Sequence, residues 1–274
     1  MIGTLAQQLS LISYGNHYFR TGELPADYYP HNPAFKFCNQ VTFSNLVEGP
    51  GQAPPTEAPA APDPVAWLRL LRQQNCRRLS LCYRPSPDNA LHTPDYQLAG
   101  FVGGGGQWLL EANAGASSDY WAGRWEVTRP QDPDQLIWGV SYVRVAVGLP
   151  PAAIHPPLPP LRAQLVRALT DIQAFATTQK LENWVGIFGR ALATLDNPVP
   201  AQGFYETLLV PAEHPLAARQ LIFAASAAWV FGGMGSWNDL GFEDAATQRR
   251  YEELSAQLYA QVNSAIVAGI NASV

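Results

Sequence analysis

The second half of the chain carries hydrophobic side chains at the spacing of amphipathic helices. Apolar residues recur every three or four positions over 161–179 and again over 181–195. Residues 216–231 are apolar nearly all round, which indicates a central helix, and a further periodic run covers 245–268. Because this spacing gathers apolar side chains on one face, the pattern predicts about four packed helices.

Two more helices are predicted in the first half of the chain, at 4–20 and 65–74. In the first, Leu5, Leu9 and Ile12 recur at helical spacing. The second begins after Pro64, a residue that is tolerated in the first turn of a helix because its φ is already helical.

Alternating bulky and polar residues predict strands between these helical regions. The predicted strands are 35–46, 78–83, 96–102, 107–113, 120–128 and 136–147. Four glycines, 103–106, separate two of them and indicate a hairpin loop. Short turns between successive strands favour an antiparallel meander over 96–147, and its bulky residues on both alternations require packing against the C-terminal helices.

Strands followed by helices predict an α+β fold. We expect an N-terminal helix and an antiparallel β meander packed against a C-terminal group of about four helices. Residues 1–148 would form a β-rich α+β part with a mobile Pro/Ala-rich loop at 48–64. A Pro-rich connector, 149–160, would join it to a helical part, 161–274, that packs with the sheet as one unit.

The amino-acid composition and net charge argue against several classes of protein. Hydrophobic residues make up 47% of the 274, charged residues only 14%, and the net charge is −5. Low charge with high apolar content argues against disorder, and the negative balance predicts no nucleic-acid binding. Three cysteines without a C-x-x-C pair, and a polar start without a signal peptide, favour a cytoplasmic location. Without an apolar run of about 18 residues, no membrane span is expected.

Motifs for cofactor, metal or covalent chemistry are absent. The glycine-rich segments match no phosphate-loop pattern, and the five histidines are too dispersed for a metal motif, so we expect no cofactor and no metal. Ser236 would need glycine at position 234 to form a nucleophile elbow, but Met234 stands there.

Four tryptophans on the predicted strands could form either a ligand platform or part of the core, and core is the commoner role. They are Trp108, Trp121, Trp125 and Trp138.

The stretch 229–242, Trp-Val-Phe-Gly-Gly-Met-Gly-Ser-Trp-Asn-Asp-Leu-Gly-Phe, connects the last two predicted helices. Because glycine lowers helix propensity, the chain should turn here, with positive φ at one or more of Gly232, Gly233 and Gly235. The candidate ligand- or partner-binding residues are Trp229, Trp237, Asn238 and Asp239.

A structural role is the alternative for the same stretch. In both cases we expect Asn238 or Asp239 to cap the following helix and Trp237 to lie half-buried against the neighbouring helix. If Trp237 is fully enclosed and Asp239 only caps backbone, the turn is structural.

These features favour a cytoplasmic binding protein that takes a protein partner or a small ligand. An immunity-type or accessory factor of a bacterial conflict system would fit this description. The alternative is an enzyme of the hydrolase or transferase class, with acid and base residues that converge near 232–242. Its candidate residues are Glu206, His214, Asp239 and Glu243. The sequence does not predict the oligomeric state.

Overall fold

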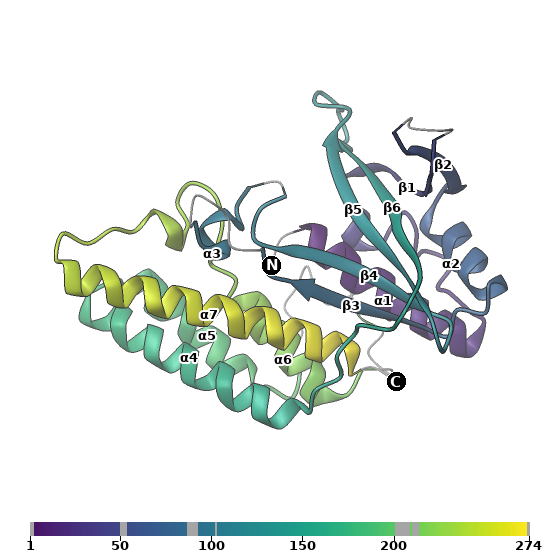
Figure 1. The fold of residues 1–274 in the computed structure, drawn as a ribbon. Coiled ribbons are helices and arrows are strands. Elements are labelled where there is room, and N and C mark those ends of the chain that lie inside the picture. Colours follow the sequence, from purple (N-terminus) through teal and green to yellow (C-terminus); the bar gives the residue numbers. More distant parts are fainter. Residues whose placement is uncertain are drawn as a thin grey trace.

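A six-stranded mixed sheet dominates the first half of the chain, and long helices form the second half (Figure 1). The computed structural model describes residues 3–49, 54–86, 93–101, 103–200, 209 and 214–272. The helices are α1 (Gly3–Thr21), α2 (Pro64–Gln73), α3 (Asp95–Leu98), α4 (Leu158–Thr178), α5 (Glu182–Thr194), α6 (Leu216–Ala227) and α7 (Ala245–Asn271). The strands are β1 (Cys38–Val47), β2 (Thr56–Ala61), β3 (Arg78–Arg84), β4 (Gln107–Asn113), β5 (Ser118–Val127) and β6 (Trp138–Leu149). The fold is α+β, as predicted.

The strand order is β2-β1-β6-β5-β4-β3. We expected an antiparallel sheet, but the sheet is mixed. β1 runs parallel to β6, with Val41 beside Val140, whereas the other neighbouring pairs are antiparallel. The alternation of residues along β1 indicates a strand but carries no information about its partner. The parallel pairing therefore could not be read from the local pattern.

The predicted strand at 96–102 is wrong. Asp95–Leu98 form the short helix α3, and Tyr96 is buried. The glycines that follow do not close a hairpin; they let the chain pass tightly from α3 to β4. A Cβ on Gly104 would lie 2.1 Å from the carbonyl oxygen of Leu98, and Gly105 has a φ of +81°. The meander accordingly starts at β4.

Part of the predicted Pro/Ala-rich loop at 48–64 is an edge strand. Residues Thr56–Ala61 pair with β1, Pro59 lies opposite Ser44, and Ala61 is only 5% exposed. Proline is compatible with an edge because one side of the strand needs no ladder hydrogen bond. Residues 50–53 of this loop lie outside the described residues. The division of the chain at 149–160 stays a prediction.

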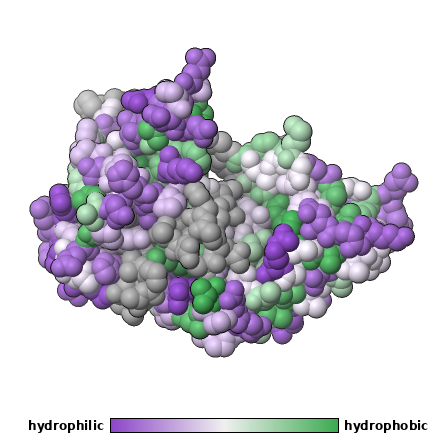
Figure 2. Space-filling view, turned by 180° about the vertical axis from the view of Figure 1, so that it is seen from behind, coloured by the Kyte–Doolittle hydropathy of each residue, from purple (hydrophilic) through white to green (hydrophobic). Residues whose placement is uncertain are grey.

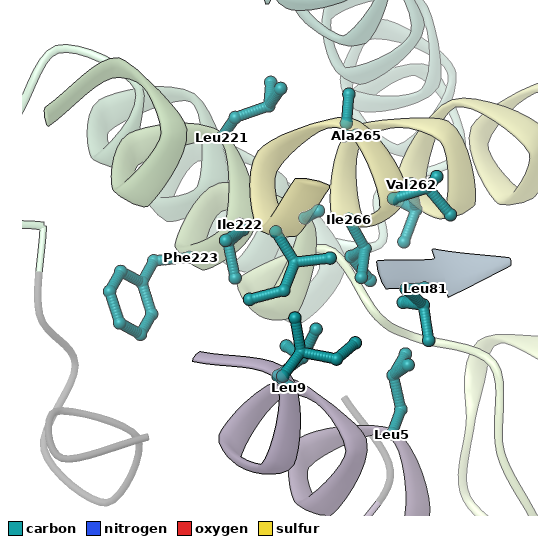
Figure 3. Close-up of a cluster of buried hydrophobic side chains, with 14 of the residues drawn as sticks. Leu5, Leu9, Leu81, Leu221, Ile222, Phe223, Val262, Ala265 and Ile266 are labelled. Carbon is teal, nitrogen blue, oxygen red and sulfur yellow. The ribbon is translucent and has the colours of Figure 1, made fainter. Parts of the chain in front are cut away.

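One hydrophobic cluster includes residues from both the sheet and the helices. Figure 3 shows Leu9 of α1, Leu81 of β3 and Ile222 of α6 directed toward one another, with Val262 and Ile266 of α7 above them. All five side chains are buried. The C-terminal helices therefore pack on the β3 end of the sheet.

Two asparagine side chains occupy the free edge of β3. The Asn16 amide, on α1, donates to the Leu79 carbonyl at 2.9 Å and accepts from the Leu79 N–H at 2.7 Å. Asn271, on α7, does the same with Leu81, at 2.9 Å and 2.8 Å. An edge strand normally presents a row of unpaired backbone groups. Here α1 and α7 pair them.

The strand tryptophans belong to the core and its margin. Trp121 is buried and its ring lies 5.5 Å from that of Trp67 on α2. The other three are partly buried against the same core cluster: Trp108, Trp125 and Trp138. Trp125 and Trp138 contact each other, with ring centroids 5.9 Å apart. This packing favours the core role over a ligand platform.

The connector between β6 and α4 is held to the sheet by a buried carboxylate. Glu111 of β4 is only 1% exposed. It accepts hydrogen bonds from the Ala153 N–H at 2.6 Å, the Ala152 N–H at 3.3 Å and the Ser118 hydroxyl at 2.6 Å, and the Cys82 thiol lies 3.2 Å away. These donors satisfy a charged group that would otherwise be costly to bury.

Candidate functional site

The glycine-rich turn between α6 and α7 begins where α6 ends, at Ala227. Gly235 has a φ of +83°, which confirms the prediction of at least one positive-φ glycine; Gly232 and Gly233 do not adopt this conformation. A short 3-10 helix, η3 (Trp237–Asp239), follows, and the Ser236 hydroxyl caps it by accepting from the Asn238 N–H at 3.2 Å.

Trp237 was predicted to be half-buried, but it is completely enclosed, at 0% exposure. Its indole N–H donates to the Ser255 hydroxyl at 2.7 Å, and its carbonyl accepts from the Tyr251 hydroxyl at 2.6 Å. Its ring packs edge-on against Trp184 and Phe188 of α5. Trp237 therefore anchors the turn to α5 and α7 and has no surface left for a ligand.

Asn238 and Asp239 also support the turn. The Asn238 amide donates to the Tyr96 carbonyl at 2.9 Å, which ties the turn to α3. Asp239 is exposed, and its carboxylate accepts from the Gly235 N–H. One of these two residues was predicted to cap α7, but neither does. Asp244 caps α7 by accepting a hydrogen bond from the backbone N–H of Thr247. Trp237 and Asp239 thus meet the condition for a structural role.

Trp229, the fourth predicted site residue, is half-buried and lines a cavity of about 470 Å³ between α5 and the turn. We call it the Trp229 cavity. Its lining residues are Trp184, Ile187, Arg190, Ala227, Trp229, Val230, Phe231, Gly232 and Ser236. The Trp229 indole N–H donates to the Phe231 carbonyl at 3.0 Å, which fixes the orientation of the ring. The cavity thus places two indole rings beside the backbone of the glycine-rich turn.

Arg190 is the one charged residue among the described residues of this lining, and sequence reasoning missed it. Its side chain is exposed and lies back along α5: a Cβ added to Gly186, four residues earlier, would be 3.4 Å from its Nη1 atom. Among the residues that the structure describes, it forms no salt bridge. The only sequence signal was a glycine one turn before an arginine, which is too common to single out a site.

A second cavity, of about 520 Å³, lies over strands β1, β2, β5 and β6, and its lining mixes polar side chains with apolar ones. Arg124 of β5 reaches across it to Glu57 of β2, with Nη1 2.9 Å from Oε1, although β1 and β6 separate the two strands. Its Nε atom is 3.1 Å from Glu126. Hydrogen bonds from Ser44 and Arg124 lower the pKa of Glu57. The charges in this cavity are thus already paired with one another.

The two ends of the molecule differ in surface character on the face seen in Figure 2. Figure 2 shows mainly hydrophilic residues over the upper part of the sheet end of the molecule, and polar and apolar residues mixed over the helical end. The Trp229 cavity lies in the helical half, beside aromatic residues of the core.

The residues named for an enzyme do not form one buried set. Asp239 and Glu243 are exposed, whereas His214 is buried. Glu206 lies outside the described residues. The enzyme alternative stays a prediction.

Within the described ranges, no cluster of three or more His, Cys, Asp and Glu side chains is arranged to hold a metal ion. No described helix combines the length and apolarity needed to cross a bilayer. No protein-family model, curated protein or solved structure matches this chain. The cytoplasmic location and the immunity-type or accessory role stay predictions, and a function must be inferred from the geometry of the site.

Proposed function

We propose that this protein acts by binding a small ligand in the Trp229 cavity. The observation that carries the proposal is the lining itself: Trp184, Trp229 and Ile187 line an open hollow of about 470 Å³. Small-molecule sites commonly have volumes of roughly 300–1,000 Å³ and mostly apolar walls with few polar groups. The cavity has this size and this chemistry.

The frame of the cavity supports a preformed site. Trp237 is fixed by Ser255 and Tyr251 of α7, and Asn238 is fixed by the carbonyl of Tyr96. Together with the packing of Trp237 against Trp184 and Phe188 of α5, these contacts hold the turn from three elements, α3, α5 and α7. A ligand that enters an ordered site does not have to order it, and more of its contact energy appears as affinity.

The cavity over the sheet is a weaker candidate, although it is slightly larger. Its guanidinium and carboxylates already satisfy one another, since Arg124 bridges Glu57 and Glu126. A charged ligand would have to separate those groups. The one aromatic residue among the cavity's described lining residues, Phe43, is buried, so this lining offers a ligand no aromatic face.

The proposal can be tested with a library of aromatic fragments screened by saturation-transfer NMR. We expect fragments to bind wild-type protein and to lose at least tenfold in affinity in Trp229→Leu. The matched control is Trp138→Leu, which removes a partly buried indole from the sheet and should leave binding unchanged. Both variants would first be compared with wild type by circular dichroism. If no fragment binds, or if Trp229→Leu binds as wild type does, the proposal is wrong.

A further inference from the structure

Arg190 gives the Trp229 cavity a positive charge that no other described lining residue neutralises. The described residues of the lining include one guanidinium and no carboxylate. Beside indole walls of low polarity, a single positive charge attracts anions more strongly than it would in open water. We infer that the ligand is a small aromatic carboxylate whose ring lies between Trp184 and Trp229 and whose charge is bound by Arg190. This inference rests on the proposed function.

The guanidinium of Arg190 is available for this role. Arg144 is paired with Asp119 at 3.1 Å and Arg162 is paired with Asp196. Arg190 has no such partner among the described residues, and its position over Gly186 keeps it next to the cavity. The planar fork of an arginine matches the two oxygens of a carboxylate, so this anion is favoured over a cation or a neutral polar group.

Two other side-chain hydrogen-bonding groups of the lining, those of Ser236 and Trp229, are already engaged. The Ser236 hydroxyl donates to the Gly232 carbonyl at 3.0 Å and accepts from the Asn238 N–H at 3.2 Å. The indole N–H of Trp229 donates to the Phe231 carbonyl. Among the described lining residues, recognition of a ligand's charge is therefore left to Arg190, while the two indoles provide flat faces for an aromatic ring.

Three matched pairs of an acid and its primary amide test the charge preference: indole-3-acetic acid, 2-naphthoic acid and 3-phenylpropanoic acid, each with its amide. Each compound would be titrated by NMR at pH 7.5 into wild type, Arg190→Gln, Arg190→Lys and the control Arg167→Gln, which changes an exposed arginine of α4. We expect each acid to bind wild type at least tenfold more tightly than its amide. Arg190→Gln should abolish the difference, Arg190→Lys should keep part of it, and Arg167→Gln should keep all of it.

Salt provides a second readout, because an exposed guanidinium is screened by ions. The acid preference of wild type should shrink between 50 mM and 500 mM NaCl, while binding of the amides should not weaken. If the acids show no preference in any of the three pairs, or if the preference survives in Arg190→Gln, the inference is overturned. The fragment screen decides separately whether the proposed binding function stands.

Discussion

The side-chain amide of Asn271, in the last turn of α7, makes with Leu81 the pair of hydrogen bonds that a neighbouring strand would make. The amide also donates to the Ile154 carbonyl at 3.2 Å, so it links the edge of the sheet to the connector. Asn271 is 1% exposed, and water does not replace these bonds easily. A side chain of α7 thus takes the place of a neighbouring strand at Leu81, as Asn16 of α1 does at Leu79.

Replacing Asn271 with alanine should destabilise the protein markedly. The substitution leaves the N–H and C=O of Leu81 buried without partners, and each such group costs about 1–3 kcal/mol. We expect the free energy of unfolding in urea to fall by at least about 2 kcal/mol. The control is Asn183→Ala, at an exposed position of α5. Equal effects of the two substitutions would show that the edge pairing contributes nothing.

Two glycines of the glycine-rich turn form a matched pair. Gly235→Ala should destabilise the protein by about 1 kcal/mol or more, because φ at this position is +83° and a Cβ disfavours that conformation. Gly233→Ala should be neutral or slightly stabilising, because Gly233 has no positive φ and no atom lies within 4 Å of the added Cβ. Thermal unfolding of both variants measures the difference, and a Gly233 variant less stable than the Gly235 variant would contradict this account.

Glu111→Gln should loosen the connector between β6 and α4. The carboxylate accepts from Ser118, Ala152 and Ala153, whereas a glutamine would direct an N–H₂ group at one or more of these donors. We expect a loss of roughly 1–3 kcal/mol in stability. Limited proteolysis should then cut the connector faster than in wild type or in Glu126→Gln, an exposed control on β5.

The same proteolysis experiment tests the predicted packing of sheet and helices as one unit. Because the hydrophobic cluster includes residues of both, cleavage of the connector should not release two separately stable fragments. Recovery of two folded fragments would refute that prediction.

All three cysteines are buried and should be unreactive in the folded protein. Burial raises the thiol pKa from 9.0 to about 11 for Cys38 and to about 12 for Cys76 and Cys82. A disulfide reagent at pH 8 should label native protein far more slowly than protein in guanidinium chloride, since the thiolate is the nucleophile. Rapid labelling of the native protein would contradict the burial.

The same shifts set a pH dependence of stability. Above about pH 9 the unfolded thiols lose protons that the folded thiols keep, so the free energy of unfolding falls as the pH rises toward 11–12. Burial raises the pKa of Tyr28 and Tyr142 too, which adds to the loss above pH 10. Urea unfolding at pH 8 and pH 10 measures it, and equal stability at both values would contradict the prediction.

The elements that follow local periodicity were predictable. The apolar stripes at 161–179 and 245–268 correspond to α4 and α7, because a helix of about 20 residues repeats its buried face several times. The edge strand β2 was missed because proline and alanine give no strand signal and its order comes from pairing with β1. The bulky residues at 96–102 do give a strand signal, but Asp95–Leu98 form a helix instead.

The candidate site was predictable only in part. The turn and Trp229 were found because glycine and tryptophan are conspicuous in sequence. Trp184 and Arg190 lie some 40 residues earlier on α5, and only tertiary packing brings them to the turn. Trp237 was misjudged because a sequence shows that an indole is present but not whether Phe188 and Ser255 enclose it.

β1 is synthesised well before β6, the strand with which it pairs in parallel. The side-chain hydroxyl of Thr42, on β1, donates a hydrogen bond to the carbonyl of Val140, 98 residues later. At roughly 5–20 residues per second, a ribosome needs about 5–20 s to supply that partner. Throughout this interval Val41 and Phe43, both buried in the finished sheet, lack the neighbour that flanks them. The nascent chain therefore passes through a stage in which chaperones that recognise apolar segments have access to β1.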